Sequence, residues 1–288
     1  MKRLSLIIVS LLMLTLTATP AAARKYGETL RILAIGNSFS DDGMEHLPAI
    51  LADLGVENVE LARLYVGGCS VERHMQFFDK QQSAYTFYTS QAGENKWVKH
   101  AEKRSIQSAL AMGEWDIITM QQASGYSGQY ETIKPHLERL VAVVKKAQPK
   151  AHLAWHITWS YSTESKHQHF PHYDNSQPKM DAAIMQAVFQ IRNDFDCLDY
   201  FIPSGTAIRM LRLSPVNNAP KDFTRDGFHL DKRVGRYLGA CTMCEVLLGK
   251  SVVGNSYHPA TITKDEALAA QKAAHAAVLK PNKVTKIK

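Results

Sequence analysis

The chain has 288 residues and a formal net charge of +7 at neutral pH, with 45% hydrophobic and 21% charged residues. This length and composition suit one large α/β domain that can bury its own core. The basic excess is spread along the chain and partly gathered between residues 280 and 288, without a stripe of Arg and Lys interleaved with aromatic residues. We therefore expect no nucleic-acid partner, and a solvated basic tail from about residue 280.

The first residues have the three-part pattern of a secretory signal peptide. A basic Lys2-Arg3 pair precedes an apolar stretch from Leu4 to Leu16, and Ala21-Ala22-Ala23 follows. The apolar stretch is too short to span a membrane, and no Cys stands at the boundary to carry a lipid. We expect cleavage after Ala23, which would lower the formal charge to +5 by removing Lys2 and Arg3. The mature protein would be exported, periplasmic or secreted, as a single domain over residues 24–288 without a stable membrane anchor; an uncleaved anchor is the alternative.

Apolar runs of strand length alternate with segments of helical periodicity along the rest of the chain. This alternation is typical of βαβ units, in which a mainly parallel sheet carries helices on both faces. The sequence therefore predicts an α/β fold, a three-layer αβα sandwich. The predicted strands are Leu30–Ile35, Val59–Val66, Ile117–Met120, Ala151–Ile157 and Leu198–Ile202, and the predicted helices are a segment through Leu54, Val71–Phe78, Ile133–Ala147, Met180–Ile191 and Asp231–Leu248.

Two segments interrupt this alternation. The stretch from Tyr85 to Val98 alternates aromatic and polar residues around Gly93, which predicts a hairpin inserted above the sheet. The stretch from Thr158 to Pro178 is rich in aromatic residues and histidines and follows a predicted strand at its C-terminal end, where loops form pocket walls. Its candidate pocket residues are Trp159, Tyr161, His169 and Tyr173, although aromatic side chains pack in cores as readily as they line pockets.

The segment Gly36-Asn37-Ser38-Phe39-Ser40 directly follows the first predicted strand. Open α/β sheets keep their active sites at the C-terminal ends of their strands. Gly36 allows a sharp turn, and Asp41-Asp42 resembles the acidic start of a helix. Ser38 is therefore a candidate nucleophile, with a helix N-cap as the alternative role.

A serine nucleophile needs a base and a carboxylate that orients it. In the segment Thr224 to Leu230, Asp226 and His229 lie three positions apart around a glycine. On one tight loop, the Asp226 carboxylate can hold one imidazole nitrogen while the other faces a serine from elsewhere in the sheet. The pair can equally be an Asx turn beside an ordinary loop histidine.

Four blocks of this chain resemble the SGNH/GDSL hydrolase superfamily, in particular its bacterial branch described as a domain of unknown function, DUF4886. Gly36-Asn37-Ser38 is similar to the nucleophile block, with Asn37 where most members have Asp, and Asp226 with His229 matches the Asp-x-x-His block. The resemblance implies a flavodoxin-like sheet, catalysis by Ser38, Asp226 and His229, and no cofactor. It implies an oxyanion hole that includes a glycine amide of the block Gly67-Gly68-Cys69-Ser70. We assign the hole to the Ser38 and Gly68 amides, favouring Gly68 over Gly67, with a tight turn as the alternative role of the two glycines. The third block departs from the family, because Gln121-Gln122-Ala123-Ser124 replaces Gly-x-Asn-Asp; we assign its side-chain donor to Gln122 and place Gln121 in the substrate pocket.

These residues predict an exported serine esterase that removes acyl groups such as acetyl, from carbohydrates by resemblance. A lipid or thioester hydrolase is the alternative within enzymes, and a glycan-binding protein without catalysis is the alternative of another class. No metal is expected, because histidines 167, 169 and 172 have no standard ligand spacing. The four cysteines are expected as buried thiols, although export would permit disulfides; they are Cys69, Cys197, Cys241 and Cys244.

Overall fold

The computed structural model describes residues 29–91, 94 and 96–287. The expected signal peptide and Gly93, at the centre of the expected hairpin, lie outside the described residues. A seven-stranded sheet runs through the described part in the order β4-β3-β2-β1-β5-β6-β7. The strands are β1 (Leu30–Gly36), β2 (Val59–Tyr65), β3 (Thr86–Gln91), β4 (Val98–Lys99), β5 (Ile117–Met120), β6 (His152–His156) and β7 (Tyr200–Ile202).

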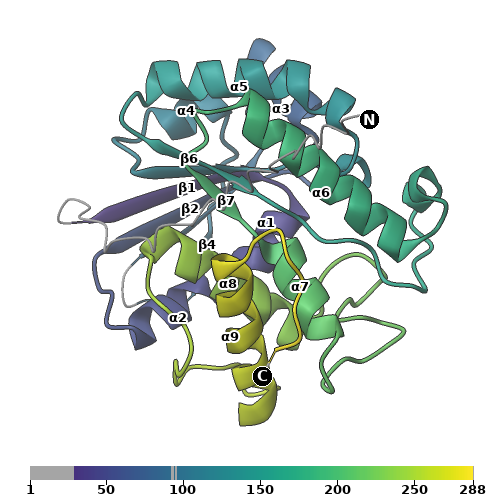
Figure 1. Cartoon of the computed structure of the whole chain (residues 1–288). Coiled ribbons are helices and arrows are strands. Elements are labelled where there is room, and N and C mark those ends of the chain that lie inside the picture. The colour runs from purple at the N-terminus through teal and green to yellow at the C-terminus, as the bar shows by residue number, and fades with distance from the viewer. Residues whose placement is uncertain (1–28, 92–93, 95, 288) are drawn as a thin grey trace, which may run out of the picture.

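Helices cover both faces of this sheet (Figure 1). One layer holds α3 (Val71–Asp79), α4 (Ile106–Leu110), α5 (Lys134–Ala147) and α6 (Gln177–Asp194). The other holds α1 (Ser38–Met44), α2 (Leu47–Asp53), α7 (Ser204–Arg212), α8 (Val234–Leu248) and α9 (Lys264–Leu279). Three short 3₁₀ helices lie in loops, η1 (Ser124–Tyr126), η2 (Tyr130–Thr132) and η3 (Phe170–Tyr173).

Strand β1 lies at the centre of the sheet, parallel to β2 on one side and to β5 on the other. All its residues except Arg31 are buried, because helices cover both of its faces. A strand buried on both faces has to be apolar throughout, which explains why the sequence here is a continuous hydrophobic run. The parallel strands all end at one edge, so the loops after β1, β2, β5, β6 and β7 gather there.

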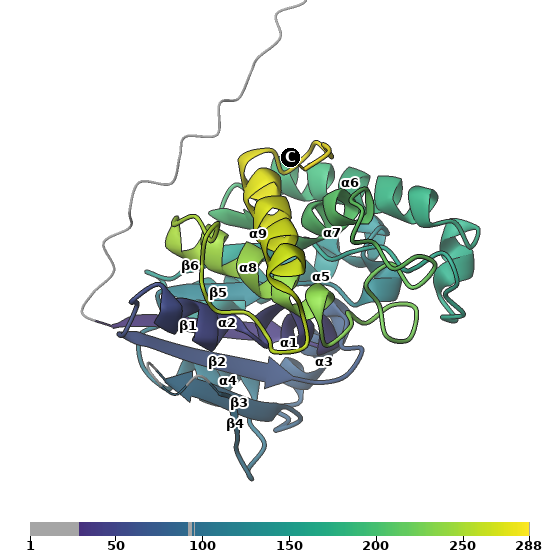
Figure 2. The same cartoon turned by 90° about the horizontal axis from the view of Figure 1, so that it is seen from below.

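The hairpin has a different position from the one expected. Strand β3 pairs antiparallel with β2, and β4 pairs antiparallel with β3. The segment therefore widens the sheet at one edge instead of lying above it, as Figure 2 shows. A free strand edge offers a row of unpaired backbone groups, which the hairpin satisfies.

Helix boundaries also correct the sequence prediction. The single helix expected through Leu54 is two helices, because Pro48 at the start of α2 has no amide hydrogen and its ring would clash with the preceding turn. Helices α4, α7 and α9 were not predicted. For α9 the signal was present in the sequence, because Thr263 and Glu266 form a capping box before an alanine-rich run.

The C-terminal segment is less solvated than expected. Thr206 Oγ1 donates a hydrogen bond to the Pro281 carbonyl at 2.6 Å, and Val284 and Ile287 pack against the core. The cysteines are free thiols; Cys197 is half-buried and the other three are buried. Within the described ranges, no helix is both long enough and apolar enough to cross a membrane.

Candidate active site

Ser38 is the first residue of α1, directly after the turn that leaves β1. Asn37 forms the N-cap: its Oδ1 accepts a hydrogen bond from the Phe39 amide at 3.0 Å. The Asn37 amide group also donates to the Cys69 carbonyl at 3.0 Å, which joins this turn to the loop after β2. An aspartate at this position could accept but not donate, so the asparagine supplies a second connection at the turn before Ser38.

The three predicted catalytic residues form one hydrogen-bonded chain. His229 Nε2 lies 2.8 Å from Ser38 Oγ, and His229 Nδ1 lies 2.7 Å from Asp226 Oδ2. With the proton of the neutral imidazole on Nδ1, the ring donates to the carboxylate and accepts from the serine hydroxyl. This is the arrangement that lets a histidine remove the proton of a serine nucleophile.

The loop from Thr224 to Leu230 gives Asp226 two functions. Its Oδ1 accepts from the His229 amide at 2.8 Å while its Oδ2 holds the imidazole. Desolvation raises the pKa of Asp226, but hydrogen bonds from the His229 side chain and backbone outweigh it, so the pKa is lower than usual. The carboxyl group therefore stays ionised beside the imidazole at neutral pH.

Gly227 allows this loop to close tightly. Its φ is +89°, and a Cβ there would lie 2.9 Å from Ser165 Cα. A side chain would therefore be strained and would also collide with the neighbouring loop. The Gly227 carbonyl accepts from the Ser162 amide at 2.8 Å, which fixes this loop to the segment after β6.

Asp42 connects the loop from Thr224 to Leu230 with α1, the helix that begins at Ser38. Its side chain is only 1% exposed, and its Oδ2 accepts from the Leu230 amide at 2.8 Å, directly after His229. It also pairs with Arg225 at 3.0 Å and with Arg236 of α8 at 2.7 Å. Burial raises the pKa of Asp42, and the two guanidinium groups oppose that rise. The sequence suggested only an acidic helix start here; the structure makes Asp42 the link between Ser38 and His229.

The neighbouring carboxyl group has a different partner. Asp41 pairs with Arg63 of β2 at 3.4 Å. Burial raises the pKa of Asp41 to about 6, and Arg63 opposes the rise.

Two backbone amides are available to an oxyanion. Among the described residues, neither the Ser38 amide nor the Gly68 amide has a hydrogen-bond partner. Gly68 has a φ of +60°, a conformation that glycine adopts without strain. Ser38 is the first residue of α1, where amides have no partner within the helix.

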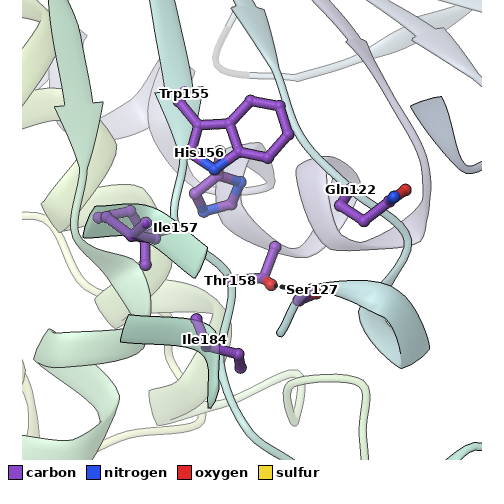
Figure 3. Close-up of a pocket in the computed structure, with 8 residues that line it drawn as sticks. Gln122, Ser127, Trp155, His156, Ile157, Thr158 and Ile184 are labelled. Atoms are coloured by element: carbon purple, nitrogen blue, oxygen red, sulfur yellow. Dashed lines mark hydrogen bonds between the residues drawn. The ribbon is translucent and has the colours of Figure 1, made fainter. Parts of the chain in front are cut away.

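Gln122 does not meet the expectation of a third oxyanion donor. Its Nε2 donates to the Thr132 carbonyl at 3.3 Å and to Thr132 Oγ1 at 3.2 Å, and its Oε1 accepts from the Val71 and Ala123 amides. Gln122 and His156 both line a cavity of about 10 Å³. In Figure 3 the side-chain amide of Gln122 points away from His156. Gln122 therefore fastens the loop after β5 to α3, and its donors are already used.

Gln121 is not a pocket residue either. It is buried, donates to Asn37 Oδ1 at 2.7 Å and contacts His156 Nδ1 through its Oε1 at 2.8 Å. Burial lowers the pKa of His156 to about 3, so this histidine is neutral. Through its bond to Asn37, Gln121 thus helps to hold the turn before Ser38.

Most of the aromatic pocket candidates are core residues. Trp159 is fully buried and stacks on Phe39 with ring centroids 4.1 Å apart. Tyr161 is fully buried, and Tyr173 is 5% exposed with its hydroxyl bonded to the Gly125 carbonyl. Only His169 is partly exposed. The sequence interpretation failed here because the packing of η1 and α6 against this loop is not visible in local patterns.

In the part of the chain that the structure describes, no group of three or more His, Cys, Asp or Glu residues could hold a metal ion. Histidines 167, 169 and 172 lie near one another, with centroids 5.4 Å and 5.0 Å apart in sequence order. The rings contact aromatic neighbours, and the set includes no carboxylate.

A family model described as "Domain of unknown function (DUF4886)" matches residues 31–277. A DUF4886 family protein from Bacteroides uniformis is 37% identical, covering 90% of this chain and 98% of its own, with a TM-score of 0.85. A candidate SGNH hydrolase from Slackia heliotrinireducens is 21% identical, covering 76% of this chain and 99% of its own, with a TM-score of 0.51. A candidate GDSL-like lipase from Parabacteroides merdae is 15% identical, covering 77% of this chain and 96% of its own, also with a TM-score of 0.51. No curated protein matches the sequence. These likenesses confirm the predicted SGNH hydrolase fold.

Proposed function

This chain belongs to the family described as a domain of unknown function, DUF4886, and we propose that it is an exported serine esterase that hydrolyses acyl esters, in particular acetyl esters of carbohydrates. The observation that carries the proposal is the hydrogen-bonded chain from Ser38 through His229 to Asp226, with distances of 2.8 Å and 2.7 Å. Its residues lie at the carboxyl edge of the sheet, where this class of fold places its sites.

The reaction begins when Ser38 Oγ attacks the ester carbonyl carbon and His229 Nε2 takes the hydroxyl proton. Asp226 stabilises the imidazolium that forms and holds its orientation. The tetrahedral intermediate collapses, the bond to the alcohol oxygen breaks, and His229 returns the proton to that oxygen. Water then repeats the sequence on the acyl-enzyme, which releases the carboxylic acid and restores Ser38.

Negative charge develops on the carbonyl oxygen during both steps. The unpaired amides of Ser38 and Gly68 supply the donors for that oxygen. The helix dipole of α1 adds a favourable field at its N-terminus, although the helix is short. With the donors of Gln122 bonded to Thr132, the hole works with two backbone amides.

The test uses the purified mature protein with p-nitrophenyl acetate, butyrate and octanoate, and the variant Ser38→Ala as the control. The proposal expects turnover of acetate well above octanoate, abolished in Ser38→Ala. Preference for octanoate would indicate a lipid or thioester hydrolase instead. Absence of turnover of all three esters would leave a glycan-binding protein and would overturn the esterase. Export is tested separately, by mass determination of the protein recovered from the periplasm, which should begin at Arg24.

A further inference from the structure

A row of rings continues from the catalytic histidine across the neighbouring loops. The Phe228 ring lies 4.1 Å from the His229 ring, and the His167 ring lies 4.5 Å from Phe228, both between centroids. His169 follows at 5.4 Å from His167, and Tyr126 of η1 lies 4.8 Å from His169. Phe228, His167, His169 and Tyr126 are all partly exposed. Three separate loops thus bring their rings to one surface beside His229.

The hydrogen bonds of His167 fix which of its nitrogens carries the proton. The His169 amide donates to His167 Nδ1 at 3.2 Å, so Nδ1 is an acceptor. Burial, with smaller contributions from His169 and His229, lowers the pKa of His167, so the ring is neutral at neutral pH and its proton is on Nε2. Within the described residues this Nε2 has no hydrogen-bond partner, and it is not a buried atom. His167 therefore presents an unused N–H donor to solvent.

The chemistry of the proposed reaction assigns this surface to one half of the ester. His229 Nε2 returns its proton to the oxygen of the leaving alcohol, so that oxygen must lie within hydrogen-bond reach of His229. The carbonyl oxygen lies instead at the Ser38 and Gly68 amides. Rings that adjoin His229 therefore flank the alcohol half of the substrate.

We propose that Phe228, His167, His169 and Tyr126 form the subsite for the alcohol half of the ester, and that the alcohol is a hydroxyl-rich ring such as a sugar. The inference rests on the proposed esterase function. The Phe228 and Tyr126 faces pack against the C–H face of the sugar, and His167 Nε2–H donates to one of its hydroxyls.

The polar edges of this surface favour a sugar over an alkyl chain. The Tyr126 hydroxyl and the His172 ring nitrogens have no hydrogen-bond partner in the described part of the chain. A fatty alcohol would remove water from these groups without replacing its hydrogen bonds, which costs free energy. A polyhydroxylated ring replaces them.

The experiment compares two acetyl esters that differ only in the alcohol. Methyl glycosides carrying one acetyl group reach the ring surface, whereas the alcohol of ethyl acetate is too small to reach His167. His167→Phe keeps a ring and removes the donor. We compare kcat/KM on the acetylated glycosides with kcat/KM on ethyl acetate. His167→Phe should lower the ratio of these two values by about 3- to 10-fold, the size expected for loss of one neutral hydrogen bond. The change should come chiefly from a higher KM on the glycosides. Tyr126→Ala, a change near the surface, should lower the same ratio by a similar factor, so the test survives if one variant fails to fold.

The matched control is His152→Phe, because His152 is an exposed histidine at the start of β6, at the end of the parallel strands opposite to the proposed site. Both activities should stay as in the wild type. An unchanged ratio in both His167→Phe and Tyr126→Ala would overturn the subsite while leaving the esterase intact. Failure of the wild type to hydrolyse any of these esters would overturn the esterase, and the subsite with it.

Discussion

The carboxylate of Asp42 offers a direct test of how the loop from Thr224 to Leu230, with its proposed base His229, is held against α1 and the proposed nucleophile Ser38. Asp42→Asn keeps the size of the side chain and removes its charge. In the wild type, Asp42 Oδ2 accepts from the Leu230 amide at 2.8 Å and from Arg225 at 3.2 Å, and an amide oxygen can keep these bonds. The new NH₂ group replaces Oδ1 and cannot accept, so the contacts of Oδ1 with Arg225 at 3.0 Å and with Arg236 at 2.7 Å are lost.

The contacts of Asp42 set the size of the effect. Removal of one partner of a buried ion pair costs about 3–5 kcal/mol, and we expect the lower end because Arg225 and Arg236 are partly exposed and can regain water. The free energy of unfolding should fall by about 3 kcal/mol, which lowers the Tm of a domain of this size by roughly 6–12 °C.

Activity should fall as well, because Leu230 directly follows His229. A misplacement of about 1 Å between reacting groups costs on the order of 10²-fold in rate. We expect kcat on p-nitrophenyl acetate to fall by about that factor below the melting transition, with KM nearly unchanged.

Glu245→Gln is the control variant for Asp42→Asn, because it tests whether loss of stability by itself lowers kcat. Glu245 is another buried carboxylate of this helix layer, paired with His275 at 2.5 Å, and lies near the C-terminal end of α8. This variant should lose stability and keep its kcat. The reasoning is refuted if Asp42→Asn melts earlier but turns over at the wild-type rate in the same assay.

Three further outcomes are expected. Ser38→Ala should lower ester hydrolysis by about 10⁴ or more with an unchanged thermal melt, and retention of more than a few per cent of wild-type turnover would exclude it as nucleophile. Asp226→Asn should lower kcat by about 10²–10⁴ with KM unchanged, because the imidazole loses the partner that fixes its tautomer; wild-type kcat would leave Asp226 a turn-forming role only. Burial lowers the pKa of His156 from 6.5 to about 3. Between these two pH values the unfolded chain binds a proton at His156 that the native protein does not bind, so the free energy of unfolding falls as the pH falls. In urea titrations, His156→Gln should therefore lose about 2 kcal/mol less than the wild type between pH 7 and pH 5, and equal losses would contradict a neutral buried His156.

The sequence alone was enough to locate the strands of the parallel sheet and the segments that meet at the proposed site. A central strand has to be apolar on both faces, so Leu30 to Ile35 was recognisable without any knowledge of its neighbours. Asp226 and His229 were recognisable for a related reason, since the tight loop that joins them is built by residues adjacent in the chain. A feature that depends only on residues close together in the chain can therefore be predicted from the sequence pattern.

Only the tertiary structure decided where the remaining side chains point. Gln122 and Gln121 are adjacent at a strand end, yet one bonds to Thr132 and the other to Asn37 and His156, partners set by other segments. The exposure of an aromatic ring is also a property of what packs on it, so Trp159 is buried while the ring of Phe228 remains partly exposed. Asp42 shows the same dependence most directly. Its carboxylate meets a backbone amide 188 positions along the chain, and no local pattern can encode a contact that exists only once the sheet has brought both segments together.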